Sequence, residues 1–465
     1  MNGCMALRPS NGGGQVKVPE ARTIDVEDVA VPVGYRVEAV ASGLVFPTAV
    51  TFDDSGGVYV VEAGYSYGEV FTEAKLLRVR TRGGTETIAT GDNPPWTGAT
   101  WHDGAFFLAE GGQREGGRIL RVTPDGTKTA LVENLPGRGD HHTNGPVIGP
   151  DGWLYFGQGT ATNSAIVGED NRHIGWLERF PDFHDTPCED VTLRGENFET
   201  RDPVSGNKVS TGAYQPYGTP TVAGQVVLGQ VPCSGAVMRL PVTGGPLELV
   251  AWGFRNPFGL AFSPDGRLFV TDNGYDVRGS RPIFGDGDWL WEAVPGAWYG
   301  WPDHADGRPL AARYRPASRK APGRLLAEWP GTPPAPVAIF GVHGSADGLD
   351  FSRDAQFGHV GEAFVAIFGD MAPATGKVLH PVGFNVVRVD VETGRIEEFA
   401  TNRGRIRGPA SWQGSGGMER PVAVRFDPTG RSLYVVDFGI LVVDGKQVTP
   451  VPGTGVLWRI WREGA

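Results

Sequence analysis

The chain has 465 residues, of which 70 are glycine and 37 are proline, and its formal net charge is -11 at pH 7. This acidic balance argues against nucleic acid as a partner, because a phosphate backbone is bound by clustered lysine and arginine. No stretch of the sequence approaches the roughly 20 apolar residues that a membrane-spanning helix requires, so no membrane span is expected.

Residues 1–32 are expected to form a flexible tail, because they are rich in glycine and polar side chains. The opening Met1-Asn-Gly-Cys-Met-Ala-Leu lacks the apolar core of a secretory signal, so these residues leave the location of the protein open. The remaining residues, 33–465, are expected to form a single domain.

A repeated pattern of two short strands runs through this domain. Its six copies begin at Pro47, Thr97, Asn144, Asn256, Asp347 and Arg420. Each copy pairs two runs of β-branched and aromatic residues across a turn, which is typical of a β-hairpin. One small sheet cannot bury both of its faces alone, so six such units predict an all-β fold, a six-bladed β-propeller of four-stranded antiparallel blades.

The second run of each copy ends on a polar residue shortly before a glycine, except in the fifth copy. These positions are Glu62, Glu110, Gln158, Asp272 and Asp437, with Ile367 as the exception. In a radial arrangement of blades they gather at one end of the central channel. The pattern therefore indicates either a cation or polar-ligand site, or polar strand ends that face channel water.

The copies are evenly spaced as far as Asn144 and further apart beyond it, which predicts long insertions at about 161–232 and 275–342. Such insertions usually project as loops from one face, which is often the functional one. The second insertion is rich in aromatic residues that either wall a flat ligand or pack beneath the loop: Trp289, Trp291, Trp298, Tyr299 and Trp301.

Two of the three cysteines, Cys188 and Cys233, fall in the first insertion, so a disulfide between them would staple it. The sequence has no Cys-x-x-Cys-His motif, which excludes a fused c-type cytochrome.

Three motifs stand out beyond the repeat. They are Gly139-Asp-His-His-Thr-Asn-Gly145, Trp252-Gly-Phe-Arg-Asn-Pro-Phe-Gly-Leu-Ala-Phe-Ser-Pro-Asp-Gly266 and Tyr299-Gly-Trp-Pro302. Together they resemble the glucose/sorbosone dehydrogenase family, over about residues 33–461. The resemblance implies a six-bladed propeller quinoprotein that uses pyrroloquinoline quinone (PQQ) and Ca²⁺ to oxidise a sugar, polyol or sugar-derived aldehyde. It also implies an external electron acceptor and a periplasmic or secreted location.

Oxidising an alcohol or lactol requires a base for the hydroxyl proton, and an imidazole with a near-neutral pKa suits that work. An ungapped count back from Ile148 matches His141 to the family's catalytic histidine, whereas a one-residue slip selects His142. Either Asp140 or Gln158 is expected to orient the imidazole, and Gln158 is also a candidate cofactor contact.

The same resemblance implies which residues hold the cofactor. Arg255 matches a residue that stabilises the anionic oxygens of a reduced quinone, and Asn256 matches one that hydrogen-bonds the quinone. Arg420 matches an arginine that grips the cofactor's carboxylates. The family's fifth-blade lysine is missing, because Asn385 stands in its position, and Lys377 is the candidate to replace it.

The family's calcium is held partly by consecutive backbone carbonyls just after a strand of the fourth blade. Those positions correspond to Gly274 and Tyr275, and Asp288 matches an acidic residue near the site. Calcium prefers oxygen ligands and acts there as a Lewis acid that polarises the quinone.

Two other functions fit the sequence. One is a calcium-dependent lactonase-type hydrolase, whose channel cation would be held by Glu62, Glu110, Asp272 and Asp437. The other is a non-catalytic propeller that binds a glycan or a protein. Four carboxyl or amide groups converging on one cation would favour the hydrolase, whereas an arginine-lined cavity beside His141 would favour the quinoprotein.

Overall fold

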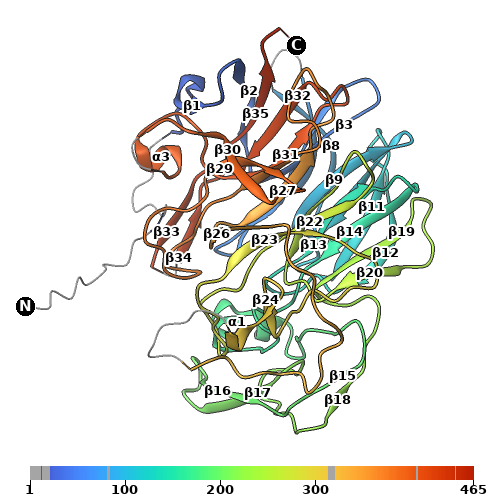
Figure 1. The fold of residues 1–465 in the computed structure, drawn as a ribbon, viewed down its shortest axis with the longest axis vertical. Coiled ribbons are helices and arrows are strands. Elements are labelled where there is room, and N and C mark those ends of the chain that lie inside the picture. The colour runs from blue at the N-terminus through green and yellow to red at the C-terminus, as the bar shows by residue number, and fades with distance from the viewer. Residues whose placement is uncertain are drawn as a thin grey trace, which may run out of the picture.

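The computed structural model describes residues 12, 21–80, 84–312, 320–404, 407–445 and 447–464. Within these residues, six antiparallel sheets of four principal strands each form the blades of a propeller (Figure 1). The predicted fold class is therefore confirmed. In the same part of the chain, no helix combines the length and the apolar character that crossing a membrane requires.

The first three blades follow one another along the chain. The first consists of β3 (Pro47–Phe52), β4 (Val58–Glu62), β7 (Ala74–Val79) and β8 (Thr85–Gly91). The second consists of β9 (Trp96–His102), β10 (Ala105–Glu110), β11 (Gly117–Val122) and β12 (Lys128–Leu135). The third consists of β13 (Thr143–Ile148), β14 (Trp153–Gln158), β19 (Ala236–Pro241) and β20 (Glu248–Trp252).

The last three blades complete the ring. The fourth consists of β21 (Pro257–Phe262), β22 (Leu268–Asp272), β23 (Gly287–Glu292) and β26 (Ala338–Val342). The fifth consists of β27 (Ala346–Phe351), β28 (Ala363–Ile367), β29 (Asn385–Asp390) and β30 (Arg395–Asn402), with the short β1 (Val29–Ala30) at its edge. The sixth consists of β31 (Pro421–Phe426), β32 (Ser432–Asp437), β35 (Gly455–Arg462) and β2 (Tyr35–Leu44).

The second strand of a blade is buried on both faces, because each sheet packs between two neighbouring sheets. Every residue of β10, β28 and β32 is buried. This explains why these strands read as continuous runs of valine, leucine and phenylalanine rather than as alternating polar and apolar residues.

The sixth blade joins the two ends of the chain. Strand β2 pairs antiparallel with β35, from Tyr35 opposite Arg462 to Leu44 opposite Gly455. The ring is thus closed by backbone hydrogen bonds between strands more than 400 residues apart in sequence.

The predicted tail is shorter than expected. Residues 21–32 belong to the fold: the 3₁₀ helix η1 (Val26–Asp28) leads into β1, and Val29 pairs with Asn402 of the fifth blade. The Arg22 guanidinium lies 2.5 Å from the carboxylate of Asp437. Backbone pairing and a buried ion pair therefore hold a segment whose composition suggested a free tail. The rest of the predicted tail, residues 1–11 and 13–20, lies outside the described residues.

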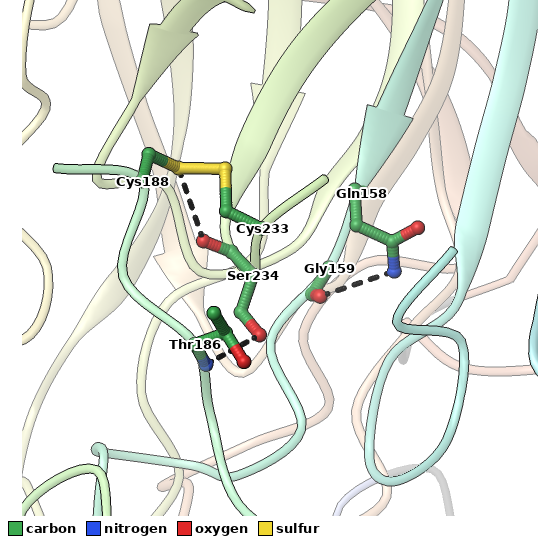
Figure 2. Close-up of a disulfide and its surroundings, with 6 residues drawn as sticks. All are labelled: Gln158, Gly159, Thr186, Cys188, Cys233 and Ser234. Carbon is green, nitrogen blue, oxygen red and sulfur yellow. Dashed lines mark hydrogen bonds between the residues drawn. A yellow bond between two sulfur atoms is a disulfide. The ribbon is translucent and has the colours of Figure 1, made fainter. Parts of the chain in front are cut away.

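The first insertion lies between β14 and β19. It contains α1 (Glu169–Ile174), α2 (Trp176–Arg179), β15 (Val191–Thr192), β16 (Asn197–Arg201), β17 (Lys208–Gly212) and β18 (Val226–Val227). Cys188 and Cys233 form the anticipated disulfide, beside which the Thr186 backbone donates to the Ser234 hydroxyl at 3.2 Å (Figure 2). The disulfide thus fixes the returning end of the insertion close to the start of β19.

The segment 275–342 is not a single insertion, because it contains β23 and β26, two strands of the fourth blade. The extra loop between them holds β24 (His304–Ala305), β25 (Arg308–Pro309) and the 3₁₀ helix η2 (Leu310–Ala312). This loop bridges to the first insertion, where Leu193 pairs with Leu326. Figure 1 shows β24 next to α1 and the strands of the first insertion, on one side of the blades.

The aromatic residues of this segment pack into the core rather than form a ligand wall. Trp289 and Trp291 lie in β23 with their rings 5.7 Å apart, and Tyr299 stacks on Phe254 at 4.1 Å. All five of the predicted aromatics are buried: Trp289, Trp291, Trp298, Tyr299 and Trp301.

Three smaller elements complete the fold. The first blade carries a hairpin of β5 (Tyr65–Ser66) and β6 (Val70–Phe71), and the sixth carries one of β33 (Leu441–Asp444) and β34 (Gln447–Pro450). The short helix α3 (Ala410–Gln413) precedes β31.

The polar residues that end the second strands have a structural role. Asp272 accepts hydrogen bonds from the backbone of Arg255 and Asn256 at 3.1 and 2.6 Å, and Asp437 does the same for Glu419 and Arg420 at 2.9 and 2.8 Å. Each carboxylate thus fixes the segment that leads into the first strand of its own blade.

The fifth blade, which has Ile367 at this position, uses a different acceptor. The backbone N–H of Ala346 donates to Asp288 of the fourth blade at 3.1 Å. The exception in the repeat is therefore compensated by a neighbouring sheet.

We expect Asp437→Ala to lower the free energy of unfolding by about 3–5 kcal/mol, because it leaves the buried Arg22 guanidinium without its charged partner. It also removes the acceptor of two backbone N–H groups and of the Trp458 indole. Denaturant unfolding measures the change. Asp54→Ala, at an exposed turn, is the control and should stay within about 0.5 kcal/mol of the parent. Equal losses in the two variants would contradict the assigned role.

Candidate functional site

A cavity of about 460 Å³ opens at one end of the ring. At this end, the chain enters the first strand of each blade and leaves the second strand. Six of the predicted site residues line it: Asp140, His141, Arg255, Asn256, Gly274 and Asp288. The β5–β6 and β33–β34 hairpins and Trp176 of α2 line it as well. The volume lies within the range of about 300–1,000 Å³ that is usual for small-molecule sites.

His141 lies in the loop between β12 and β13, with a side chain that is 7% exposed. Gly159 makes room for it, because a Cβ at that position would lie 2.2 Å from the His141 Cβ. The glycine that follows the polar end of β14 is thus required for the close approach of the imidazole loop.

The contacts of His141 fix the proton on one ring nitrogen. Nδ1 lies 2.9 Å from the carbonyl oxygen of Thr160 and 3.1 Å from its hydroxyl, whose own proton is donated to the Thr162 carbonyl. Since a carbonyl oxygen only accepts, we assign Nδ1 as the donor, which leaves a lone pair on Nε2. His141 can therefore act as a base through Nε2.

The electrostatic surroundings keep this imidazole neutral. Burial, followed by the charges of Arg255 and Arg278, holds the pKa of His141 well below its ordinary value. A neutral imidazole at neutral pH is the protonation state that a proton acceptor requires.

His142 is not among the described residues that line the cavity. Its Nδ1 lies 3.0 Å from the Gly137 carbonyl, its ring packs edge-on against Tyr65, and burial lowers its pKa to about 4. Of these two adjacent histidines, therefore, His141 is the one that appears among the described residues lining the cavity.

Thr160, rather than Asp140 or Gln158, orients the imidazole of His141. Asp140 accepts a hydrogen bond from Arg278 at 2.5 Å. Gln158 is fully buried in β14, where it accepts from the Thr143 hydroxyl at 2.8 Å and donates to the Pro136 carbonyl.

Arg255 is fixed by hydrogen bonds on several sides. Its guanidinium donates to the carboxylate of Asp276 at 2.9 Å and to the side-chain oxygen of Asn163 at 3.0 Å. The side chain is 3% exposed, so the positive charge is held in place before any ligand arrives.

Asn256 belongs to a chain of hydrogen-bonded amides, of which Asn256 and Asn273 line the cavity. It accepts from the Asn144 amide at 3.0 Å and donates to the Asn273 side chain at 2.7 Å. The Asn273 amide in turn donates to the Ala346 carbonyl at 3.0 Å.

Arg420 is buried behind the cavity wall. It donates to the carbonyl oxygens of Gly369 and Asp370 at 2.7 and 3.2 Å, and it lies over the rings of Phe368 and Phe384. Burial lowers its pKa to about 10. Because Gly369 lines the cavity, Arg420 supports the wall through backbone contacts.

The positions linked to the family's fifth-blade lysine are not among the described residues that line the cavity. Lys377 is exposed, and Asn385 donates to the carboxylate of Glu398 at 3.1 Å. Among the described residues that line the cavity, Arg255 and Arg278 are the cationic ones.

The Asp288 carboxylate lies beside the backbone of Gly274. Asp288 accepts the Gly274 N–H at 2.9 Å, and burial raises the pKa of its carboxyl to about 6. Tyr275 is buried. Its backbone N–H donates a hydrogen bond to the Asp286 carboxylate, and its hydroxyl donates one to the His304 carbonyl. A hard cation held by backbone carbonyls fits this donor set. The described residues contain no group of three or more histidine, cysteine or acidic side chains arranged to hold a metal.

The ring of carboxylates required by the lactonase alternative does not form. Glu62 accepts the Val45 backbone N–H at 2.7 Å, and Glu110 accepts from Trp96 and Arg118 at 3.1 and 3.0 Å. Asp272 and Asp437 are likewise used within their own blades. Each group therefore satisfies local donors instead of converging with the others on a cation.

No family model and no curated protein sequence matches the chain. Solved structures match its fold. The holo form of the PQQ domain of pyranose dehydrogenase from Coprinopsis cinerea has a TM-score of 0.56 and 16% identity, over 96% of this chain and 98% of that one. The PQQ-bound aldose sugar dehydrogenase from Streptomyces coelicolor has a TM-score of 0.52 and 16% identity, over 93% and 100%.

The calcium structure of a Trichoderma reesei protein of Carbohydrate-Active Enzymes Family AA12 is also similar, with a TM-score of 0.54 and 16% identity, over 95% of this chain and 98% of that one. At these identities the likeness establishes a common fold.

Several residues of the site were not anticipated from the sequence. Asp276, Arg278 and His343 line the cavity, and Thr160 and Asn163 contact His141 and Arg255. Thr160 acts through its backbone carbonyl, which has no sequence signal. Asp276 and Arg278 lie one and three residues after Tyr275, so their charges beside the predicted carbonyls of Gly274 and Tyr275 were the available signal.

We expect the ¹³Cε1 resonance of His141 to show no titration between about pH 8 and about pH 6, because burial and two arginines lower its pKa. Labelled histidine and loss of the signal in His141→Asn provide the assignment. A midpoint near the ordinary histidine value would contradict the neutral, Nδ1-protonated imidazole.

Proposed function

We propose that the chain is an oxidoreductase that uses PQQ and Ca²⁺ to oxidise a sugar, polyol or sugar-derived aldehyde. The observation that carries this proposal is that the His141 imidazole and the Arg255 guanidinium line the same cavity. The shared fold with PQQ-bound and calcium-bound structures supports the choice of cofactors.

The residues of the chain would divide the work as follows. His141 accepts the substrate's hydroxyl proton at Nε2, while the proton on Nδ1 stays on the ring and is donated in a hydrogen bond to the Thr160 carbonyl. Arg255, held by Asp276, presents fixed positive charge to oxygens that become anionic during the reaction. Asn256 supplies an amide for hydrogen bonding. Burial of these groups excludes water and strengthens each charge interaction.

The cofactors would be held by residues of the fourth blade. Gly274 and Tyr275 would offer backbone carbonyls to Ca²⁺ beside Asp288, and Arg255 and Asn256 would bind the quinone. When bound, PQQ supplies the two-electron acceptor and Ca²⁺ the Lewis acid that polarises it. The resemblance also suggested side-chain contacts from Gln158, Arg420 and Lys377, which are left out of this set because none is among the described lining residues. Tyr275 is not a lining residue either, but it stays in the set because its proposed contact uses the backbone carbonyl next to that of Gly274.

The disulfide between Cys188 and Cys233 supports a periplasmic or secreted location, because such bonds persist in oxidising compartments. An external electron acceptor completes the reaction, since the bound quinone must be reoxidised after each turnover.

Reconstitution tests the proposal. Purified protein is titrated with PQQ and Ca²⁺, and the reduction of a dye is followed with a panel of aldoses, polyols and aldehydes. We expect His141→Asn to reduce kcat by at least about 100-fold, because a positioned base contributes that much. His184→Asn, an exposed histidine in the first insertion, is the matched control and should retain activity.

Absence of both PQQ binding and dye reduction at every cofactor concentration would overturn the proposal. Full activity in His141→Asn would show that another group is the base.

A further inference from the structure

Arg278 is an arginine of the cavity wall that contacts three carboxylates from three parts of the chain. Nη2 lies 2.5 Å from Asp140, Nη1 lies 2.7 Å from Asp170, and Nε lies 3.0 Å from Asp276. Asp140 directly precedes His141, Asp170 lies in α1 of the first insertion, and Asp276 follows β22.

Asp276 continues this network to the second arginine of the cavity. The Asp276 oxygen that accepts from Arg278 also accepts from Arg255 at 2.9 Å. Asp140, Arg278, Asp276 and Arg255 therefore form an unbroken series of alternating charges. The series begins at Asp140, which is next to His141 in sequence, and ends at the guanidinium of Arg255 in the fourth blade.

From this series we propose that Arg278 is a positioning residue, which fixes the positions of His141 and Arg255 relative to each other across the cavity. The inference rests on the proposed function, because it assigns those two residues to one reaction.

The backbone around Arg278 is anchored independently of its side chain. The Val277 N–H donates to the Thr375 carbonyl at 2.8 Å, and the Asp276 N–H donates to Asn163 at 2.9 Å. These bonds tie the segment to the fifth blade and to the first insertion. The Arg278 guanidinium adds the connection to the loop that carries His141.

An arginine suits this position for geometric reasons. Its planar group presents N–H donors in several fixed directions, so it can serve three carboxylates at once. A lysine retains the charge but has a single nitrogen, which cannot reproduce the three-way contact. A neutral residue would leave three mutually repelling carboxylates beside the imidazole.

The position of Arg278 gives a readout that a purely structural role would not change. The charged and titratable groups that lower the pKa of His141 are Arg255, Arg278 and His142. Removing the Arg278 charge takes away a positive neighbour and leaves Asp140 uncompensated. Both effects favour the protonated imidazole, so the pKa of His141 should rise.

The test compares Arg278→Gln and Arg278→Lys with the parent enzyme. In Arg278→Gln we expect kcat to fall by about 100-fold, as displacement of reacting groups by about 1 Å can cause. The acid limb of the kcat/KM profile should also move to higher pH. In Arg278→Lys the limb should stay in place while kcat remains reduced, because the charge is kept and the three-way contact is lost.

Arg239→Gln is the matched control, because Arg239 also bridges two carboxylates, Asp151 and Glu248, but lies on the surface of the third blade. We expect the parent kcat and pH profile in this variant. Parent kcat in either Arg278 variant, or a reduced kcat in Arg278→Gln with no movement of the acid limb, would overturn the inference.

The His141 resonance separates this inference from the proposed function. It is followed in the cofactor-free protein, where the pKa of His141 should rise in Arg278→Gln and stay unchanged in Arg278→Lys. A rise without dye reduction by the parent protein would refute the dehydrogenase while supporting the positioning role. An active parent with an unchanged His141 titration in Arg278→Gln would refute the positioning role alone.

Discussion

The pairing of β2 with β35 is the constraint on which the rest of the structure depends. The faces of a blade are buried only by neighbouring blades, so an open ring would expose two sheets to water. Strand β2 comes from the beginning of the chain and completes the last blade, which closes the ring. The loops of the third, fourth and fifth blades then meet at one end of the ring, where His141, Arg255 and Gly369 line one cavity.

The repeat in the sequence predicted the blades because each hairpin carries its own signal of β-branched and aromatic runs around a turn. Strand pairing across the chain has no such signal. Residues 29–30 were therefore assigned to a tail although Val29 pairs with Asn402. Strand β23 was assigned to an insertion because Gly287-Asp-Trp-Leu-Trp-Glu292 lies outside the two-strand repeat.

The site was predictable where a side chain itself carries the chemistry, as for His141 and Arg255. It was not predictable where geometry decides between equal candidates. His141 and His142 are adjacent, and the Thr160 carbonyl and Gly159 determine which imidazole reaches the cavity. Similarly, the strand-end carboxylates resembled a cation site in sequence, but the backbone N–H groups of their own blades are their partners. In this repeat, buried backbone N–H groups of the same blade are thus the hydrogen-bond partners of the acidic side chains, which explains why those side chains do not form a ligand site.

The central claim is that one cavity presents a basic imidazole and a fixed guanidinium to the same planar ligand. A crystal structure of the chain grown with PQQ and Ca²⁺ tests it most directly. The account predicts the quinone between His141 Nε2 and the Arg255 guanidinium, each within hydrogen-bonding distance of about 3.5 Å or less of a ligand or substrate atom. A quinone bound elsewhere, or a cavity closed by packed side chains between the two residues, would contradict it.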